Sequence, residues 1–140
     1  MNYQQSYRIQ EPPRILTSKE SVPYGSTKEV AYSYDEALGL AMPANTPGVE
    51  RAKALYTTDC SMCHGPTGSG EGPMTQYFIK ENASPPVDFL SQRVLQRKDG
   101  ELFWLITNSI GNMPGFGRLL SEEDRWALVR YIRFVQGRNT

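Results

Sequence analysis

The sequence predicts an all-α domain of three principal helices, preceded by an extended, largely irregular N-terminal arm. Two observations support this prediction. Apolar residues recur at helical spacing, next to capping residues, in residues 46–59, 99–111 and 121–136. Residues 1–45 sustain neither a helical nor a strand period. We therefore expect an arm of residues 1–45 and a single domain of residues 46–140.

The first helix is expected over residues 46–59. Thr46 is a capping residue, and Pro47 stands at the first helical position, where proline is favoured. Val49, Ala52 and Tyr56 then recur at steps of three and four residues. This spacing places them on one face, which we expect to point inward.

The second and third helices are expected over residues 99–111 and 121–136. Asp99 is a capping residue for the second helix, and Gly111 stands where a helix commonly ends. Ser121 and Asp124 form an approximate capping box for the third. The apolar stripes of these two helices are Leu102, Leu105, Ile106 and Ile110 in the second, and Leu128, Ile132 and Val135 in the third.

The predicted arm is rich in proline and in aromatic residues. Pro12, Pro13, Pro23 and Pro43 interrupt a polar stretch, so it cannot build a core of its own. Flexible tails are usually poor in aromatic residues. This stretch contains five tyrosines: Tyr3, Tyr7, Tyr24, Tyr32 and Tyr34. We expect an arm that orders against its own domain or a neighbouring subunit, and whose deletion leaves the domain stable.

The segment Cys60-Ser61-Met62-Cys63-His64 is the C-x-x-C-H signature of covalent c-type haem attachment. With this spacing, one helical turn lets both sulfurs form thioethers with the two vinyl groups on one edge of the porphyrin. His64 then lies under the iron as the proximal ligand. The motif predicts one haem c.

The motif has two other interpretations. A structural zinc site usually takes four Cys or His ligands, and this chain has two Cys and one His in total. A redox dithiol normally starts a helix that follows a strand, whereas here a predicted helix leads into Cys60. A dithiol or disulfide remains the alternative to haem.

The sixth iron ligand cannot be a second histidine of this chain, because His64 is the only one. Methionine is the usual alternative. The five candidates are Met1, Met42, Met62, Met74 and Met113. Met113 has the best context, because Pro114, Gly115 and Gly117 constrain the loop around it. Met74, beside a glycine-rich loop, is the second choice.

Together, the Cys60–Gly65 segment, the glycine-rich stretch after it, the Met113–Phe116 segment and the closing helix resemble a class I cytochrome c domain over about residues 46–137. The resemblance implies three principal helices around one covalent haem. It also implies thioethers at Cys60 and Cys63, axial ligation by His64 and Met113, and one-electron transfer without catalytic residues.

Charge and hydropathy exclude some functions. With 15 basic and 15 acidic side chains, the chain has no electrostatic basis for binding nucleic acid. No apolar run approaches the length of a membrane span. The resemblance implies haem attachment outside the cytoplasm, yet residues 1–10 show no signal peptide. We expect a mature, exported protein in the periplasm or at the extracytoplasmic face of the cell membrane, with a signal peptide or lipoprotein leader removed.

Two classes of function fit a haem protein of this kind. In an electron carrier, the iron has no open site for a substrate. In a haem enzyme or ligand sensor, an exogenous molecule displaces Met113. The chain lacks a second histidine, the usual peroxidase base, so we favour an electron carrier that is not itself an enzyme.

Within electron transfer, a fixed subunit is favoured over a free soluble periplasmic shuttle. Shuttles typically use a charged face, whereas this chain is neutral and has a long aromatic arm. Residues 12–14 and 21–25, with Trp126 and Tyr131, are similar to the monohaem cytochrome subunit of bacterial alternative complex III. That resemblance implies a quinol-oxidising respiratory or photosynthetic membrane complex. A multihaem cytochrome and an iron–sulfur protein would be its partners, with a downstream electron acceptor.

Overall fold

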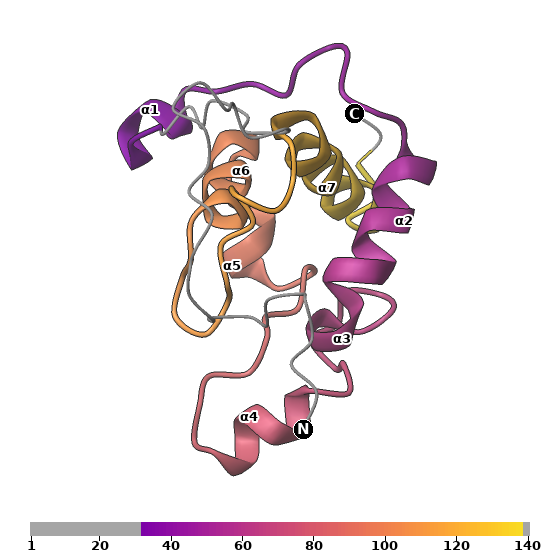
Figure 1. Cartoon of the computed structure of the whole chain (residues 1–140), viewed down its shortest axis with the longest axis vertical. Helices are drawn as coiled ribbons and strands as arrows, with labels where there is room; N and C mark the ends of the chain where they lie inside the picture. Colours follow the sequence, from indigo (N-terminus) through magenta and orange to yellow (C-terminus); the bar gives the residue numbers. More distant parts are fainter. Residues whose placement is uncertain (1–31, 139–140) are drawn as a thin grey trace, which may run out of the picture.

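In a computed structural model, residues 32–138 are described, and they form seven helices and no strand (Figure 1). The helices are α1 (Tyr34–Leu38), α2 (Val49–Asp59), α3 (Ser61–His64), α4 (Thr75–Lys80), α5 (Gln92–Leu95), α6 (Asp99–Thr107) and α7 (Glu122–Val135). The prediction of an all-α fold is confirmed. Among the described residues, no helix has the length and apolar character needed to cross a bilayer.

The core lies where α2, α6 and α7 meet. α7 packs against both α2 and α6, and α1 packs against the far side of α6 (Figure 1). Phe103 of α6 and Val129 of α7 are the largest fully buried side chains. The Phe103 ring stacks on Trp126 with 4.3 Å between centroids. Removal of these apolar and aromatic surfaces from water is the main source of the domain's stability.

The first long helix begins later than predicted. α2 starts at Val49 with Gly48 as its N-cap, so Pro47 lies outside it. Thr46 does not cap the helix, because its hydroxyl and its N–H both donate to the carbonyl of Pro43, at 2.7 and 3.1 Å. A turn over residues 43–46 therefore takes the place of the first predicted helical turn.

The second long helix ends earlier than predicted, at Thr107 rather than near Gly111. The N–H groups of Phe116 and Gly117 donate to the carbonyls of Ile106 and Thr107, at 2.8 and 3.1 Å. A further helical turn would need these two carbonyls. The returning loop thus ends the helix, and the predicted N-cap, Asp99, is instead its first residue.

Ser121 caps α7 by accepting a hydrogen bond from the N–H of Asp124 at 3.1 Å, as predicted. The loop after the motif contains two short helices, α4 and α5. Ser91 is the N-cap of α5.

Residues 32–45 of the predicted arm are folded against α6. Ala37 is completely buried, and Trp104 donates its indole N–H to the carbonyl of Tyr32 at 3.2 Å. A Cβ at Gly100 would lie 1.8 Å from the carbonyl oxygen of Ala37, so the contact needs glycine. α1 was not predicted, and it shows that these residues are part of the domain's packing.

Residues 1–31, the larger part of the predicted arm, lie outside the described residues. The extended arm and its docking role therefore remain predictions.

Candidate cofactor site

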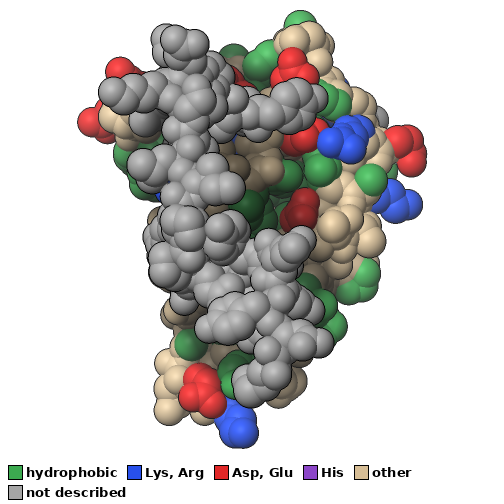
Figure 2. All heavy atoms as spheres, in the orientation of Figure 1, with side chains coloured by type: hydrophobic (Ala, Val, Ile, Leu, Met, Phe, Trp, Pro, Cys, Tyr) green, Lys and Arg blue, Asp and Glu red, His purple; other side chains and the backbone are tan. Residues whose placement is uncertain are grey.

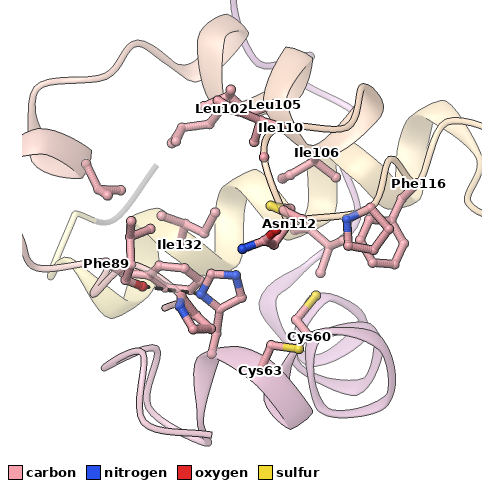
Figure 3. Close-up of a pocket in the computed structure, with 18 of the residues that line it drawn as sticks. Cys60, Cys63, Phe89, Leu102, Leu105, Ile106, Ile110, Asn112, Phe116 and Ile132 are labelled. Carbon is pink, nitrogen blue, oxygen red and sulfur yellow. Dashed lines mark hydrogen bonds between the residues drawn. The ribbon is translucent and has the colours of Figure 1, made fainter. Parts of the chain in front are cut away.

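A cavity of about 350 Å³ opens between α3, α5, α6 and the loop that follows α6. Its walls are mainly apolar, and Figure 3 labels several of the lining residues: Phe89, Leu102, Leu105, Ile106, Ile110, Phe116 and Ile132. The four residues predicted to bind the cofactor, Cys60, Cys63, His64 and Met113, all line this cavity. The fold thus brings together residues that lie about 50 positions apart in sequence.

Cys60 and Cys63 reach the cavity from one short helical turn. Cys60 ends α2 and also precedes α3, so the chain bends at this residue. The next turn places Cys63 and His64 on the cavity wall. Figure 3 shows the two thiols on the same side of the cavity, with Leu102, Leu105 and Ile110 on the opposite side.

The turn that carries the motif is held by the glycine-rich loop after it. Three loop N–H groups donate to three successive carbonyls of the turn: Met74 to Met62 at 3.1 Å, Gly72 to Cys63 at 3.1 Å and Gly70 to His64 at 2.9 Å. These are the carbonyls that a helix end leaves without partners. A Cβ at Gly72 would lie 2.4 Å from the Met62 oxygen, so only glycine permits this approach.

The ring of His64 is oriented by a backbone carbonyl. Its Nδ1 lies 3.3 Å from the carbonyl oxygen of Val87, and its ring lies 5.0 Å from that of Phe89. A proton on Nδ1 is donated to this carbonyl, which leaves the Nε2 lone pair free for a metal. Burial lowers the pKa of His64, although the Val87 carbonyl opposes this, so the neutral ring is favoured at pH 7.

The surroundings of Cys60 do not suit a reactive thiol. Burial, with smaller contributions from Asp59 and Cys63, raises the pKa of Cys60 to about 12. A nucleophilic cysteine needs a lowered pKa, because the thiolate is the reactive form. Within the described part of the chain, no group of three or more His, Cys, Asp or Glu residues could hold a metal ion. Neither observation supports the dithiol or the zinc alternative.

The loop that carries Met113 is fixed at two points. Ile110 and Met113 exchange backbone hydrogen bonds of 3.1 and 3.0 Å across a tight turn, in which Gly111 has a φ of +56°. This left-handed conformation favours glycine. A Cβ at Gly115 would lie 2.8 Å from the Thr107 oxygen, so the loop also runs closely against the end of α6. Met113 is therefore held at the cavity wall.

The alternative methionines lie elsewhere. Met74 is the N-cap of α4 and is over a third exposed, and Met62 is more than half exposed. Met42 packs against the core. None of these three lines the cavity, and Met1 lies outside the described residues.

Some lining residues were not predicted from the sequence. The unpredicted polar residues are Tyr56, Asp59, Ser84, Arg93, Arg97 and Asn112. Tyr56 donates its hydroxyl to the carbonyl of Gly65, and its ring stacks on Tyr131 with 4.5 Å between centroids. The helical spacing of Tyr56 indicated only that it lies on an inward face. No local sequence signal marked the other five polar residues as part of the cavity wall.

The residues present fit a covalently attached haem. Two thiols on one turn, an oriented imidazole and a thioether in a constrained loop all line one mainly apolar cavity. Thiols, imidazole and thioether are the groups by which proteins attach and ligate haem c.

A family model described as cytochrome c oxidase, cbb3-type, subunit III matches residues 47–132. A solved chain of the Kuenenia stuttgartiensis reducing HAO-like protein complex is similar in fold, with a TM-score of 0.53 and 24% identity. The match covers 69% of this chain and 46% of that chain, which is less than half of its length. The c-type cytochrome KustC0563 has a TM-score of 0.48 and 23% identity, over 60% of this chain and 95% of its own. No curated protein matches.

Proposed function

We propose, from the premise that this chain belongs to the cytochrome family described as cytochrome c oxidase, cbb3-type, subunit III, that it carries a single haem c with His and Met axial ligands. Membership makes it a class I c-type cytochrome, a haem protein that transfers electrons. The observation that carries the proposal is that Cys60, Cys63, His64 and Met113 line one cavity.

Each of the four residues has a distinct role in this proposal. The Cys60 and Cys63 sulfurs form the covalent links, and His64 offers Nε2 as one axial ligand while Val87 holds its ring. Met113 offers its thioether as the other. The bound haem supplies one-electron exchange between Fe(II) and Fe(III). The mainly apolar walls would limit the access of water to a bound haem.

Covalent attachment is tested on the purified protein. Acidic acetone should fail to extract the pigment, and a pyridine haemochrome should report two saturated vinyl groups. Cys60→Ala with Cys63→Ala should leave any bound haem extractable. An extractable b-type spectrum from the unaltered protein would overturn the assignment.

The axial methionine is tested with a matched pair of variants. Met113→Ala should abolish the sulfur-to-ferric-iron charge-transfer band, open the iron to carbon monoxide and lower the reduction potential. Met74→Ala removes a thioether that does not line the cavity and should leave all three unchanged. If Met74→Ala produced these three changes and Met113→Ala did not, Met74 would be the axial ligand instead of Met113. Carbon monoxide binding by the unaltered protein would favour the ligand-sensor alternative.

We further infer that the protein is a fixed electron-transfer subunit of an extracytoplasmic membrane complex rather than a free shuttle. The family's description names an oxidase subunit, which supports this role. The net charge is zero, and Figure 2 shows charged side chains scattered singly over one face of the described residues. The described residues visible in this view therefore show no large patch of one sign that would steer brief encounters.

The partners proposed for such a subunit are a multihaem cytochrome, an iron–sulfur protein and a downstream electron acceptor. A quinol-oxidising complex like alternative complex III is one candidate. The segments that suggest it, residues 12–14 and 21–25, lie outside the described residues.

Membrane-complex membership is tested by capture from detergent-solubilised native membranes. Full-length protein should retain redox subunits that a form lacking residues 1–31 loses. This truncation spares residues 32–45, which pack on α6. Equal recovery of partners by both forms would remove the docking role of residues 1–31, and recovery by neither would favour the shuttle.

A further inference from the structure

Two positive charges lie on the otherwise mainly apolar cavity. Arg93, in α5, and Arg97, two residues past its end, both line it. The negatively charged lining residue, Asp59, lies next to Cys60 at the end of α2. The cavity is thus electrically asymmetric, with cations near α5 and an anion beside the cysteines.

Haem itself is asymmetric in the same sense. It carries two propionate carboxylates, and burying a carboxylate is unfavourable unless a cation or hydrogen-bond donors accompany it. Arginine is well suited to bind carboxylates, because its planar fork donates two parallel hydrogen bonds. A carboxylate beside Asp59 would instead be repelled.

We propose that Arg93 and Arg97 form the carboxylate-binding edge of the cavity, and that Glu101, held by Tyr34, moderates the charge that Arg97 presents there. This proposal rests on the haem proposed above. It assigns the two arginines, Glu101 and Tyr34 a role in setting the reduction potential.

Arg97 is held firmly and partly neutralised. Its side chain is 19% exposed and forms a salt bridge with Glu101, whose side chain is 14% exposed. The hydroxyl of Tyr34 donates to the same carboxylate at 2.6 Å. The backbone of Arg97 is also fixed, because Arg133 donates to its carbonyl at 2.5 Å.

Arg93 differs from Arg97 in these respects. It is exposed, and within the described part of the chain it has no ion pair or hydrogen bond. Among residues 32–138, no carboxylate therefore offsets its charge. A cation near the haem disfavours the oxidised iron, which carries one more positive charge than the reduced iron. Arg93 should raise the reduction potential more than Arg97 does.

Glu101 should act in the opposite direction. Without its carboxylate, Arg97 would present its full charge to the cavity. Tyr34 belongs to the segment 32–45, where its ring also lies edge-on to Trp104 at 5.1 Å. The hydrogen bond from Tyr34 thus connects this segment to a residue of the cavity wall.

The test is the midpoint potential of the holoprotein in four variants. Arg93→Gln should increase the ratio of oxidised to reduced protein at a fixed ambient potential by about tenfold, equal to about 59 mV for one electron. Arg97→Gln should act in the same direction with a smaller effect, and Glu101→Gln in the opposite direction. Tyr34→Phe should give a shift smaller than that of Glu101→Gln, and this shift should vanish in the Glu101→Gln background.

Lys98→Gln is the matched control. Lys98 follows Arg97 and is exposed, but it does not line the cavity, so its loss changes net charge without changing the edge. An equal shift from Lys98→Gln and Arg93→Gln would overturn the proposal, because the effect would then be one of overall charge. A Glu101→Gln shift in the same direction as Arg97→Gln would overturn the role of Glu101.

Two further measurements keep the outcomes distinct. Arg93→Lys keeps a cation and should restore most of the potential lost in Arg93→Gln. Haem content by pyridine haemochrome shows whether each variant matured, and the unaltered protein tests the haem proposal itself. A fully loaded Arg93→Gln protein with an unchanged potential would refute the proposed edge while leaving the haem site intact.

Discussion

The core of α2, α6 and α7 and the attachment region of α3, its loop and α4 are held together in different ways. In the core, large side chains such as Phe103, Trp126 and Val129 are buried against one another. In the attachment region, backbone hydrogen bonds and close glycine contacts carry the structure. Several apolar side chains there are more than half exposed: Met62, Tyr77 and Ile79.

This difference suggests a division between stability and cofactor geometry. Apolar burial stabilises the core, some of whose residues, such as Leu102, Ile106 and Ile132, also line the cavity. The attachment region depends on exact backbone spacing around the motif and borders a cavity that its own side chains do not fill. Substitutions in the core should therefore reduce stability first, and substitutions in the attachment region should reduce haem attachment first.

The largest expected effect is that of Phe103→Ala in the core. Phe103 is 1% exposed and stacks on Trp126, so truncation leaves a cavity and should lower the free energy of unfolding by about 3–5 kcal/mol. Urea unfolding measures the change. Phe134→Ala, at a position 50% exposed, is the control and should cost far less. If both variants lost the same free energy of unfolding, burial of Phe103 in the core would not be the reason for its contribution to stability.

Gly72→Ala tests the attachment region. The added Cβ would lie 2.4 Å from the Met62 oxygen, so the loop must move away from α3, at a cost of up to about 3 kcal/mol. We expect the fraction of protein with covalent haem to fall more steeply here than in Phe103→Ala. Pyridine haemochrome per mole of protein measures it. Gly48→Ala, where a Cβ meets open space, is the control. Normal haem content in Gly72→Ala would contradict the division proposed between the two regions.

Truncation tests whether residues 32–45 stabilise the core or are dispensable for it. Removing residues 1–45 exposes the face of α6 that Ala37 covers and should lower stability by about 2 kcal/mol relative to removing residues 1–31. Thermal unfolding of the two forms measures the difference. Identical melting temperatures would restore the original expectation that the whole of residues 1–45 is dispensable for the domain.

Ser121→Ala should have the smallest effect. It removes the side-chain acceptor of the Asp124 N–H at the start of α7 and should cost about 1 kcal/mol. Ser121→Asp keeps an acceptor and should preserve stability in the same urea titration. A loss in Ser121→Asp as large as that in Ser121→Ala would show that capping is not the reason.

Some features that depend on neighbouring residues in sequence were predicted well, whereas the caps expected at Thr46 and Asp99 were wrong. The Ser121 cap and the single turn that carries Cys60, Cys63 and His64 are local, so spacing alone indicated them. The early end of α6 was not predictable, because it depends on hydrogen bonds from Phe116 and Gly117. Such returning contacts leave no periodic pattern in the sequence.

The candidate site shows the same limit. The motif and the proline–glycine context of Met113 identified four lining residues. Arg93 and Arg97 could not be assigned, because only the folded chain places α5 beside the cavity. The docking of α1 was equally hidden, since it depends on contacts between residues far apart in sequence, such as Ala37 with Gly100 and Tyr34 with Glu101.

The contacts of the two tryptophans provide an optical consequence. Trp126 is buried in the core, whereas Trp104 bonds to Tyr32 and contacts Tyr34. In apoprotein carrying Trp126→Phe, indole emission would come from Trp104 alone. Release of residues 32–45 would expose that ring to water and shift its emission to longer wavelength. The domain thus contains its own fluorescent reporter of whether the N-terminal segment is docked.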